Sequence, residues 1–525
     1  MTKRYGADER EPEALESAPL IPDTSGIKVQ PKPNENLSED PKRDLIMANP
    51  WAKASLAITL TFGVVGYLDQ VYSTPLTYYM YNELGITTQE YYVYKALKTV
   101  PIMLNVVFGF FGELYPINKK RSKWLMFIGL VISMACYIYL AAIGTPSYNQ
   151  CLWTVLMATS GAHCASACAY ILVQDRSEKE SFKGRGRFMT TCLIVNSAGA
   201  FFGQVVSLFY GTTISTELGD DTYLLSMSDM WLCAAMAPAL VAPWCFFVIE
   251  DDCEPAKFRA EIRKIMDCMA QPFVYKPILA MTAVKFLVFD NSANSTFLLD
   301  GCGITEFQYT VQTMASMGGA WATNAIYKRV FFTWEFRTVF ALTVIVATAV
   351  KMSDYIAGHT SIARSQWPCF LYYGWDGLLA DWASYTAIAT HSVLIVIMCN
   401  GCGARTGKEN LILNSMITAG WDLMQICSDY YSTWFNVSTE AISKGNYQGW
   451  YGMQLLTVIV TSIGLTMVPL IPTTRESFAA FISNCLKTEQ RDYNVANGML
   501  AWWSFAIVFT VAFAAFKDFF LGDSS

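Results

Sequence analysis

The chain has 525 residues, of which 53 % are hydrophobic and 15 % are charged, against roughly 25 % charged residues in ordinary soluble proteins. This composition cannot supply the charged surface that a soluble fold of this length needs. A net charge of −6, with the basic residues in short scattered clusters, argues against a nucleic-acid binder. The 15 cysteines are an odd number and lie mostly inside apolar runs, so we do not expect a disulfide scaffold.

The first segment, residues 1–50, is rich in Pro, Glu, Asp and Lys and has no apolar stretch typical of a cleavable signal peptide. We predict that it is a disordered cytoplasmic tail. Within it, Glu16 to Ile21 fits an acidic dileucine sorting pattern, which would direct the protein to a vacuolar or lysosomal membrane. Such short patterns often arise by chance, so the other interpretation is an inert tail on a plasma-membrane protein.

Apolar runs of about 20 residues, enough to cross a bilayer, follow one another from residue 54 onward. The pattern predicts twelve membrane-spanning helices and a candidate thirteenth. Their ranges are 54–76, 91–113, 123–143, 151–174, 188–211, 229–249, 277–299, 308–330, 337–357, 368–398, 410–433, 450–471 and 498–520. The last run either spans the membrane or lies in its interface, because Lys517 and Asp518 stand near its end.

Basic residues alternate sharply between the loops. The loops near 118–124, 176–187 and 257–264 are basic, whereas 144–150 and 211–230 contain no Lys or Arg. The positive-inside rule therefore places the N-terminus and the basic loops, including Lys183, in the cytoplasm. It places the sequon Asn436-Val-Ser438 in an outer loop, so we predict a glycoprotein modified at Asn436.

The long loop 250–276 divides the spans six and six. We predict an N-terminal half at 51–249, a cytoplasmic central loop at 250–276, a C-terminal half at 277–471 and a final segment at 472–525. The halves resemble each other, because Tyr115 and Tyr327 each end a span and precede a basic loop. This layout predicts an all-α polytopic membrane protein with the major facilitator fold, whose substrate site lies between the halves near the membrane midplane.

One loop carries a more specific resemblance. The stretch Gly109-Phe-Phe-Gly-Glu113, continuing to Arg121 and Trp124, resembles the turn between the second and third helices of the folate-biopterin transporter family. Matching features elsewhere are Gly66, Pro101, the exit segment from Tyr78 to Ile86, and Tyr327-Lys-Arg followed by Arg337. The similarity covers roughly residues 55–475 and implies a major facilitator transporter of folates or pterins.

The chain also departs from that family. Acids expected in the fourth span fall on Ser166 and Tyr170, and Asp175 is the acid that remains at the inner end of this span. The acid expected near the start of the eleventh span has only Glu409 as an approximate match. These departures concern the substrate more than the fold.

Charged residues inside a span usually face a cavity or a partner, because their burial in lipid is costly. Such acids are Asp69 in the first span, Asp290 in the seventh and Asp422 in the eleventh. Asn294 lies one helical turn beyond Asp290, with Asn291 beside it, so we expect a shared face. Asp69 and Asp290 occupy matching helices of the two halves and are predicted to face one central cavity, as substrate or proton-coupling groups. The alternative is acids hydrogen-bonded for packing.

Cations occur in two of the spans. Lys95 and Lys98 in the second span form one stripe with Asn105 and suit the carboxylates of a folate tail. The alternative, which we favour, is that both lysines extend toward the outer membrane surface. Lys285 in the seventh span is five residues from Asp290 and is expected to point elsewhere.

His163 forms a polar stripe in the fourth span with Ser166 and Tyr170. A proton relay is one interpretation, and a hydrogen-bonded packing histidine is the favoured one. Cys399-x-x-Cys402 has no second pair or nearby histidine, so a zinc site is not expected there. We find no ATP-binding or hydrolase motif, and we expect neither a cofactor nor an enzymatic activity.

These observations predict a secondary active transporter for folate-like or pterin-like solutes, proton-coupled and monomeric, in contact with the lipid bilayer. Gly109, Glu113 and Arg121 would form a cytoplasmic latch whose partners exchange between the two states. Because this latch is expected at the wet membrane edge, loss of Arg121 should reduce transport with little loss of folded protein. The alternatives are a facilitator for another small organic solute and a receptor or scaffold that transports nothing.

Overall fold

The structure is a computed structural model, and it describes residues 46–86, 88–181, 184–210, 225–288, 291, 294–360, 362, 365–402, 407–435, 437, 441–442 and 444–516. All these elements belong to one unit, Lys42–Ser525. The predictions for Lys183, Asp290 and Asn436, and those for the tail before residue 46, lie outside the described residues.

Helices account for the first six predicted spans. They are α2 (Lys53–Val71), α3 (Ser73–Tyr78), α4 (Thr88–Met103), α5 (Asn105–Leu114), α6 (Lys123–Ile143), α7 (Tyr148–Ser177), α8 (Arg187–Ser207) and α10 (Met227–Val241). The second span is divided between α4 and α5 at Leu104. Pro101 precedes this break by one turn, and a proline within a helix removes a backbone hydrogen bond and bends the chain. The turn is local, because Leu104 N donates to Val100 O over 3.0 Å and Phe108 N donates to Leu104 O over 3.4 Å. The range Val93–Leu114 therefore remains one candidate membrane span.

The later helices follow the predicted ranges with one exception. They are α11 (Phe258–Met269), α12 (Pro272–Leu287), α13 (Asn294–Thr296), α14 (Glu306–Arg329), α15 (Phe336–Gly358), α16 (Gln366–Gly401), α17 (Lys408–Trp434), α19 (Gln448–Ile463), α20 (Arg475–Lys487) and α21 (Tyr493–Ala515). Short π-helical turns at Tyr79–Glu83 and Phe297–Gly301, and 3₁₀ turns at Ala242–Phe247 and Gly464–Leu470, extend some of them.

The exception is the seventh span, predicted as one helix over 277–299. The helix α12 ends at Leu287, Val288 is extended with φ −88° and ψ 91°, and helical structure resumes at Asn294. The sequence after Val288 is rich in Asn, Asp and Ser, whose side chains compete for backbone hydrogen bonds and favour turns. The prediction of one continuous helix over 277–299 is therefore wrong, whereas the face shared by Asn294 and Asp290 stays a prediction, because Asp290 lies outside the described residues.

Within the described residues, ten helices are long and apolar enough to cross a membrane. The predicted eighth and eleventh spans correspond to α14 and α17, which have 24 and 27 residues but a more polar composition. The structure is thus an all-α polytopic membrane protein of the major facilitator type.

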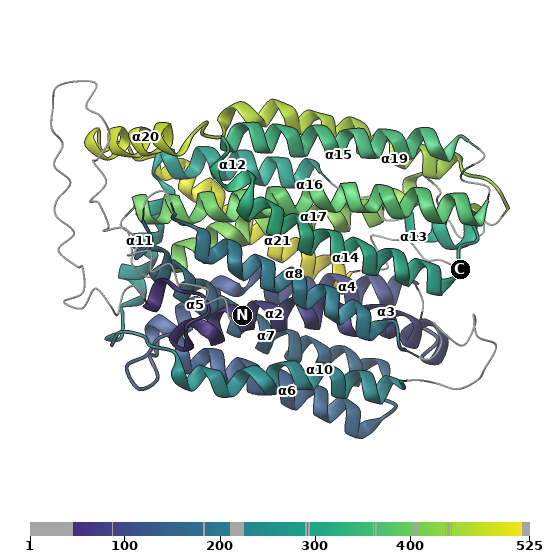
Figure 1. Cartoon of the computed structure of the whole chain (residues 1–525), viewed down its shortest axis with the longest axis horizontal. Coiled ribbons are helices and arrows are strands. Elements are labelled where there is room, and N and C mark those ends of the chain that lie inside the picture. The colour runs from purple at the N-terminus through teal and green to yellow at the C-terminus, as the bar shows by residue number, and fades with distance from the viewer. Residues whose placement is uncertain are drawn as a thin grey trace, which may run out of the picture. The chain divides into compact units, whose positions relative to one another are not determined.

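Helix contacts recur in the two parts of the bundle. In the first part α2 packs on α8, and α6 packs on α7 and α10; in the second part α12 packs on α17, and α15 packs on α16 and α19. These are the same pairs when spans one to six are matched with seven to twelve. The helices α8 and α14 join the two parts along a common seam, and Figure 1 shows them side by side in the middle of the view.

The bundle has two ends, which we call the basic end and the opposite end. The basic end carries the loops 115–122, 178–181 and 250–257 together with α11 and α20, on the left of Figure 1. The opposite end carries α13, on the right. The candidate thirteenth span, α21, begins at the basic end, where Asp492 N donates to Ala270 O over 2.8 Å. Near its other end Phe513 packs with Ala96 of α4, so α21 runs along the length of the bundle.

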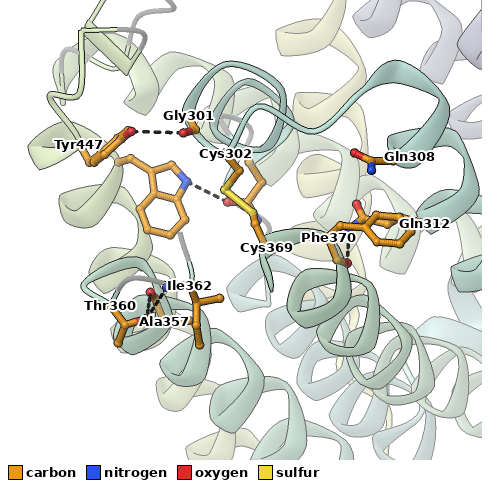
Figure 2. The surroundings of a disulfide bond; sticks show 12 residues. Gly301, Cys302, Gln308, Gln312, Ala357, Thr360, Ile362, Cys369, Phe370 and Tyr447 are labelled. Atoms are coloured by element: carbon orange, nitrogen blue, oxygen red, sulfur yellow. Dashed lines mark hydrogen bonds between the residues drawn. A yellow bond between two sulfur atoms is a disulfide. The ribbon is translucent and has the colours of Figure 1, made fainter. Parts of the chain in front are cut away.

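A disulfide at the opposite end was not predicted from the sequence. It joins Cys302, which follows the π-helical turn, to Cys369 in the first turn of α16 (Figure 2). Hydrogen bonds surround it: Tyr447 Oη donates to Gly301 O over 3.3 Å, and Gln312 Nε2 donates to Phe370 O over 2.6 Å. The pairing could not be foreseen because the two cysteines are 67 residues apart.

We expect Cys302→Ser to destabilise the protein by about 4 kcal/mol, the value for a cross-link that closes a loop of roughly this length. Thermal unfolding of the purified protein in detergent, without reductant, should show a lower midpoint for the variant. Dithiothreitol should lower the wild-type midpoint to the same value. Cys253→Ser, at a free cysteine of the basic end, is the control. An unchanged midpoint in Cys302→Ser would show that the bond contributes nothing.

Candidate functional site

A cavity of about 580 Å³ lies among the C-terminal helices. α12, α15, α16, α17 and α19 contribute its wall, and Tyr170 of α7 adds one side chain from the other half. Its ionisable lining residues, apart from tyrosines, are Lys285, Lys351, Asp354, Asp376, Asp381 and His391. Cations and carboxylates thus face one space inside the apolar bundle, as expected for a site that takes up a polar solute.

Two carboxyl groups meet in the wall of this cavity. Asp354 of α15 and Asp376 of α16 line the same wall, and Asp376 interacts electrostatically with Lys351. Ser353 Oγ donates to Asp376 Oδ1 over 3.0 Å, and Gln454 Nε2 donates to Asp354 Oδ2 over 3.4 Å. A carboxyl group near a second carboxyl group holds its proton more firmly, because like charges disfavour the ionised form. The pair is therefore a place where a proton can be bound and released.

This cluster was missed in the sequence analysis, although a signal was present. Lys351 and Asp354 lie three residues apart within the predicted span 337–357, and Asp376 lies within 368–398. The rule that intramembrane charges face a cavity applies to all three. Lys285 lines the same cavity. Its direction relative to Asp290 stays a prediction, because Asp290 lies outside the described residues.

The asparagines predicted beside Asp290 do line this cavity. Asn291 is buried and its Nδ2 donates to Gln454 Oε1 over 3.3 Å. Asn294 Oδ1 accepts from Trp450 Nε1 over 3.1 Å, and the Trp450 ring stacks on Phe297 at 4.0 Å between centroids. Asn294 therefore also anchors the interrupted seventh span to α19.

A second cavity, of about 250 Å³, lies between the two halves. It is lined by His163, Ser166 and Tyr170, which form the predicted polar stripe of the fourth span, and by Asn105 of α5. Tyr170 also lines the first cavity, as do Tyr385 and Asn414. The two cavities therefore adjoin, and together they extend from the C-terminal half to the seam between the halves.

Three other predicted residues gather on the N-terminal side of this seam. Asp69 of α2 is in electrostatic contact with Lys98 of α4 and His163 of α7. Lys98 Nζ also lies 5.3 Å from the centre of the Tyr72 ring. Lys95, by contrast, is exposed, so the favoured interpretation that both lysines extend toward the membrane surface fits Lys95 and not Lys98. The structure thus brings together an acid, a lysine and a histidine that the sequence placed in three separate spans.

Asp422 of α17 lies apart from both cavities. Its side chain is buried, at 8 % exposure, but it is not among the residues that line either of them. Its neighbours along α17, Ala419 and Leu423, pack in a cluster with Met103 of α4 and Ala506 of α21. A buried acid that neither of these two cavities reaches is a poor candidate for contact with a solute in this state.

The predicted latch residues meet at the basic end. Arg121 Nη1 lies 3.3 Å from Glu113 Oε1, as the sequence suggested, and the same guanidinium reaches Asp175 Oδ2 at 2.5 Å and Glu250 Oε1 at 3.5 Å. Glu250 also accepts backbone N–H groups, from Lys123 over 2.9 Å among others. One cation thus joins three carboxylates from the turn, the end of the fourth span and the start of the central loop.

The latch is buried, and this overturns the expectation of a wet membrane edge. The side chains of Arg121, Glu113 and Glu250 are 13 %, 3 % and 2 % exposed. Burial alone would lower the pKa of Arg121, but the charges of Asp175 and Glu113 outweigh it, so the pKa is raised above its ordinary value. Burial raises the pKa of Glu250, and hydrogen bonds from backbone N–H groups and the charge of Arg121 oppose the shift.

Gly109, the first latch residue, serves a packing role between α5 and α17. A Cβ atom at this position would lie 2.7 Å from Leu411 Cδ1, closer than carbon atoms approach without displacement. A larger residue here would therefore require the Leu411 side chain to move.

Polar contacts between the halves close the basic end of the bundle. Gln174 of α7 is fully buried; its Nε2 donates to Asn400 Oδ1 over 2.7 Å, and its Oε1 accepts from Asn410 Nδ2 over 3.0 Å. Along the seam Asn324 Nδ2 donates to Ser197 Oγ over 3.1 Å. Solute in the cavities would therefore have no direct path to the basic end.

The fold defines a class of protein, an integral membrane protein with many membrane-spanning helices. The model of the BT1 family matches residues 66–358, more than half of the chain. The chain therefore belongs to the BT1 family, the folate-biopterin transporters, and the resemblance stated from the turn at Glu113 is confirmed. No curated protein matches the chain.

Proposed function

We propose that this protein is a secondary active transporter of folate-like or pterin-like solutes that works by alternating access. The observation that carries the proposal is the 580 Å³ cavity with lysines and aspartates in its wall. Lys285 and Lys351 suit the carboxylates of a folate tail, and aspartates such as Asp381 suit the N–H donors of a pterin ring. Apolar and aromatic residues around them, such as Trp421, suit the flat ring.

The same geometry supports proton coupling. The carboxyl pair Asp354–Asp376 holds a proton in a space that is dry when shut and wet when open, so its proton affinity changes during the cycle. In this proposal the pair binds and releases the coupled proton, a role predicted from the sequence for Asp69 and Asp290. Asp69, with Lys98 and His163, supplies a second polar cluster at the seam, through which solute or proton passes between the halves.

The described state is closed at the basic end, through Gln174 and the Arg121 cluster. We propose that the basic end is cytoplasmic, as the loop charges indicate. The disulfide between Cys302 and Cys369 at the opposite end supports this orientation, because disulfides persist in oxidising compartments outside the cytosol. The described state would then precede the release of solute into the cytoplasm. The protein would work as a monomeric symporter in the plasma membrane or a vacuolar membrane. Its two halves would be the predicted ranges 51–249 and 277–471.

Uptake by purified protein in liposomes tests the proposal. We expect labelled folate or pterin to accumulate when the pH outside is lowered, and unlabelled solute to compete. Lys351→Met should reduce this uptake at least tenfold, because the cavity loses a cation that the carboxylates of the solute need. Uptake of another organic solute alone would assign the second candidate substrate class, and absence of any uptake by folded protein would support a receptor or scaffold.

A further inference from the structure

A third cavity, of about 660 Å³, lies at the basic end, between α8 and α14. It is separate from the solute cavities, with which it shares no lining residue. Its charged lining residues are Arg187 from α8, Lys328 and Arg329 from α14, and Glu180 from the preceding loop. Three cations thus face a space that is formed jointly by the two halves.

The one carboxylate of this cavity is engaged by the backbone. Glu180 accepts hydrogen bonds from Gly186 N and Phe188 N, each over 2.7 Å. It therefore holds the loop that leads into α8 and compensates the three cations only in part. Lys328 is held in place by Thr191, to whose Oγ1 it donates over 2.6 Å, and Arg187 and Arg329 are exposed. The cavity is consequently a cationic site with two exposed arginines and one lysine held by a hydrogen bond.

Apolar side chains continue from this cavity along the outer surface of the seam. Ile194 and Ala325 line the cavity, and beyond them lie Phe202 and Trp321, which are 54 % and 37 % exposed with ring centroids 6.1 Å apart. Ile326 is also exposed, at 44 %. A cationic cavity that opens onto an apolar surface at the membrane edge matches an amphiphile with an anionic head and hydrocarbon chains.

We propose that this cavity binds the phosphate headgroup of an anionic membrane lipid, with the acyl chains lying along α8 and α14. Basic cavities between membrane helices on the cytoplasmic side bind such headgroups, because that leaflet is rich in anionic lipid. Bidentate and charge-assisted hydrogen bonds from arginine and lysine to phosphate oxygens supply the affinity. The lipid would join Arg187 of one half to Lys328 and Arg329 of the other.

Thermal unfolding of the full-length protein in a neutral detergent tests this site without a transport assay. We expect dioleoyl phosphatidic acid and a phosphatidylinositol phosphate to raise the unfolding midpoint, and dioleoyl phosphatidylcholine to leave it unchanged. Soluble inositol phosphate and inorganic phosphate at the same concentrations should have much smaller effects, because they lack acyl chains. Equal protection by the soluble anions would assign a free phosphate compound and overturn the lipid.

Variants locate the binding. Lys328→Gln with Arg329→Gln should weaken the lipid at least tenfold, because two charge-assisted contacts are lost. Arg259→Gln with Arg263→Gln, two exposed residues of α11 at the same end, is the control with the same charge change. If the double variant of α14 does not fold, Arg187→Gln, at an exposed residue, tests the site from the other half. Equal weakening by the α11 control, or no protection of the native protein by any lipid, would overturn the proposal.

Discussion

Arg121→Ala is expected to lower the free energy of unfolding by about 3–5 kcal/mol, the cost of removing one member of a buried ion pair. Without the guanidinium, Glu113 and Glu250 are carboxylates that are 3 % and 2 % exposed and have no cation at the centre of their cluster. The cluster joins three segments of the chain at the basic end, so we also expect transport to be lost. The sequence instead predicted little loss of folded protein in Arg121→Ala, because it placed Arg121 at the wet membrane edge.

The measurement is thermal unfolding in detergent, together with uptake into liposomes at equal amounts of folded protein. Lys119→Ala is the matched control: Lys119 is an exposed residue of the same turn, and substitutions of exposed residues usually change stability by about 0.5 kcal/mol or less. Arg121→Lys should recover only part of the stability, because a lysine cannot reach three carboxylates with a planar fork. A native midpoint in Arg121→Ala would show that the cluster is not a structural element.

Local features of the chain were predictable from the sequence, and contacts between distant segments were not. The apolar runs located the membrane helices, and the pair of Glu113 and Arg121 could be inferred because both belong to one turn. Asp175 and Glu250, which complete the cluster, lie 54 and 129 positions after Arg121 in the sequence. No periodicity within a helix reports which loop folds onto which turn.

The interruption of the seventh span shows a second limit. Hydropathy favours a helix through 277–299, and it does not register that a run of Asn, Asp and Ser offers the backbone other hydrogen bonds. Asn294 could be recognised as a polar residue near the site, but its partner Trp450 is 156 positions away. The cysteines of the disulfide were equally hidden, since Cys302 and Cys369 lie beside predicted spans and nothing in their spacing pairs them.

The substitution that bears most directly on coupling is Asp376→Asn. It keeps the shape of the side chain and an oxygen that can accept from Ser353, but it removes a group that can bind and release a proton. We expect the variant to lose accumulation driven by a pH gradient at least tenfold while it still exchanges labelled for unlabelled solute across the membrane. Lys351 would then lose one of the negative charges that oppose its own at all pH values, so solute carboxylates should bind at least as well as before.

Both readouts come from the same liposomes, with and without an imposed pH gradient, and Asp252→Asn at the exposed basic end is the control for the substitution itself. Lys351→Met combined with Asp376→Asn removes both charges and tests whether the exchange that remains depends on the lysine; we expect that it does. Accumulation at the native level in Asp376→Asn would mean that the carboxyl pair does not carry the coupled proton. The cluster of Asp69, Lys98 and His163 at the seam would then be the better candidate, because it is the other place in the described bundle where an acid and a histidine meet near a cavity.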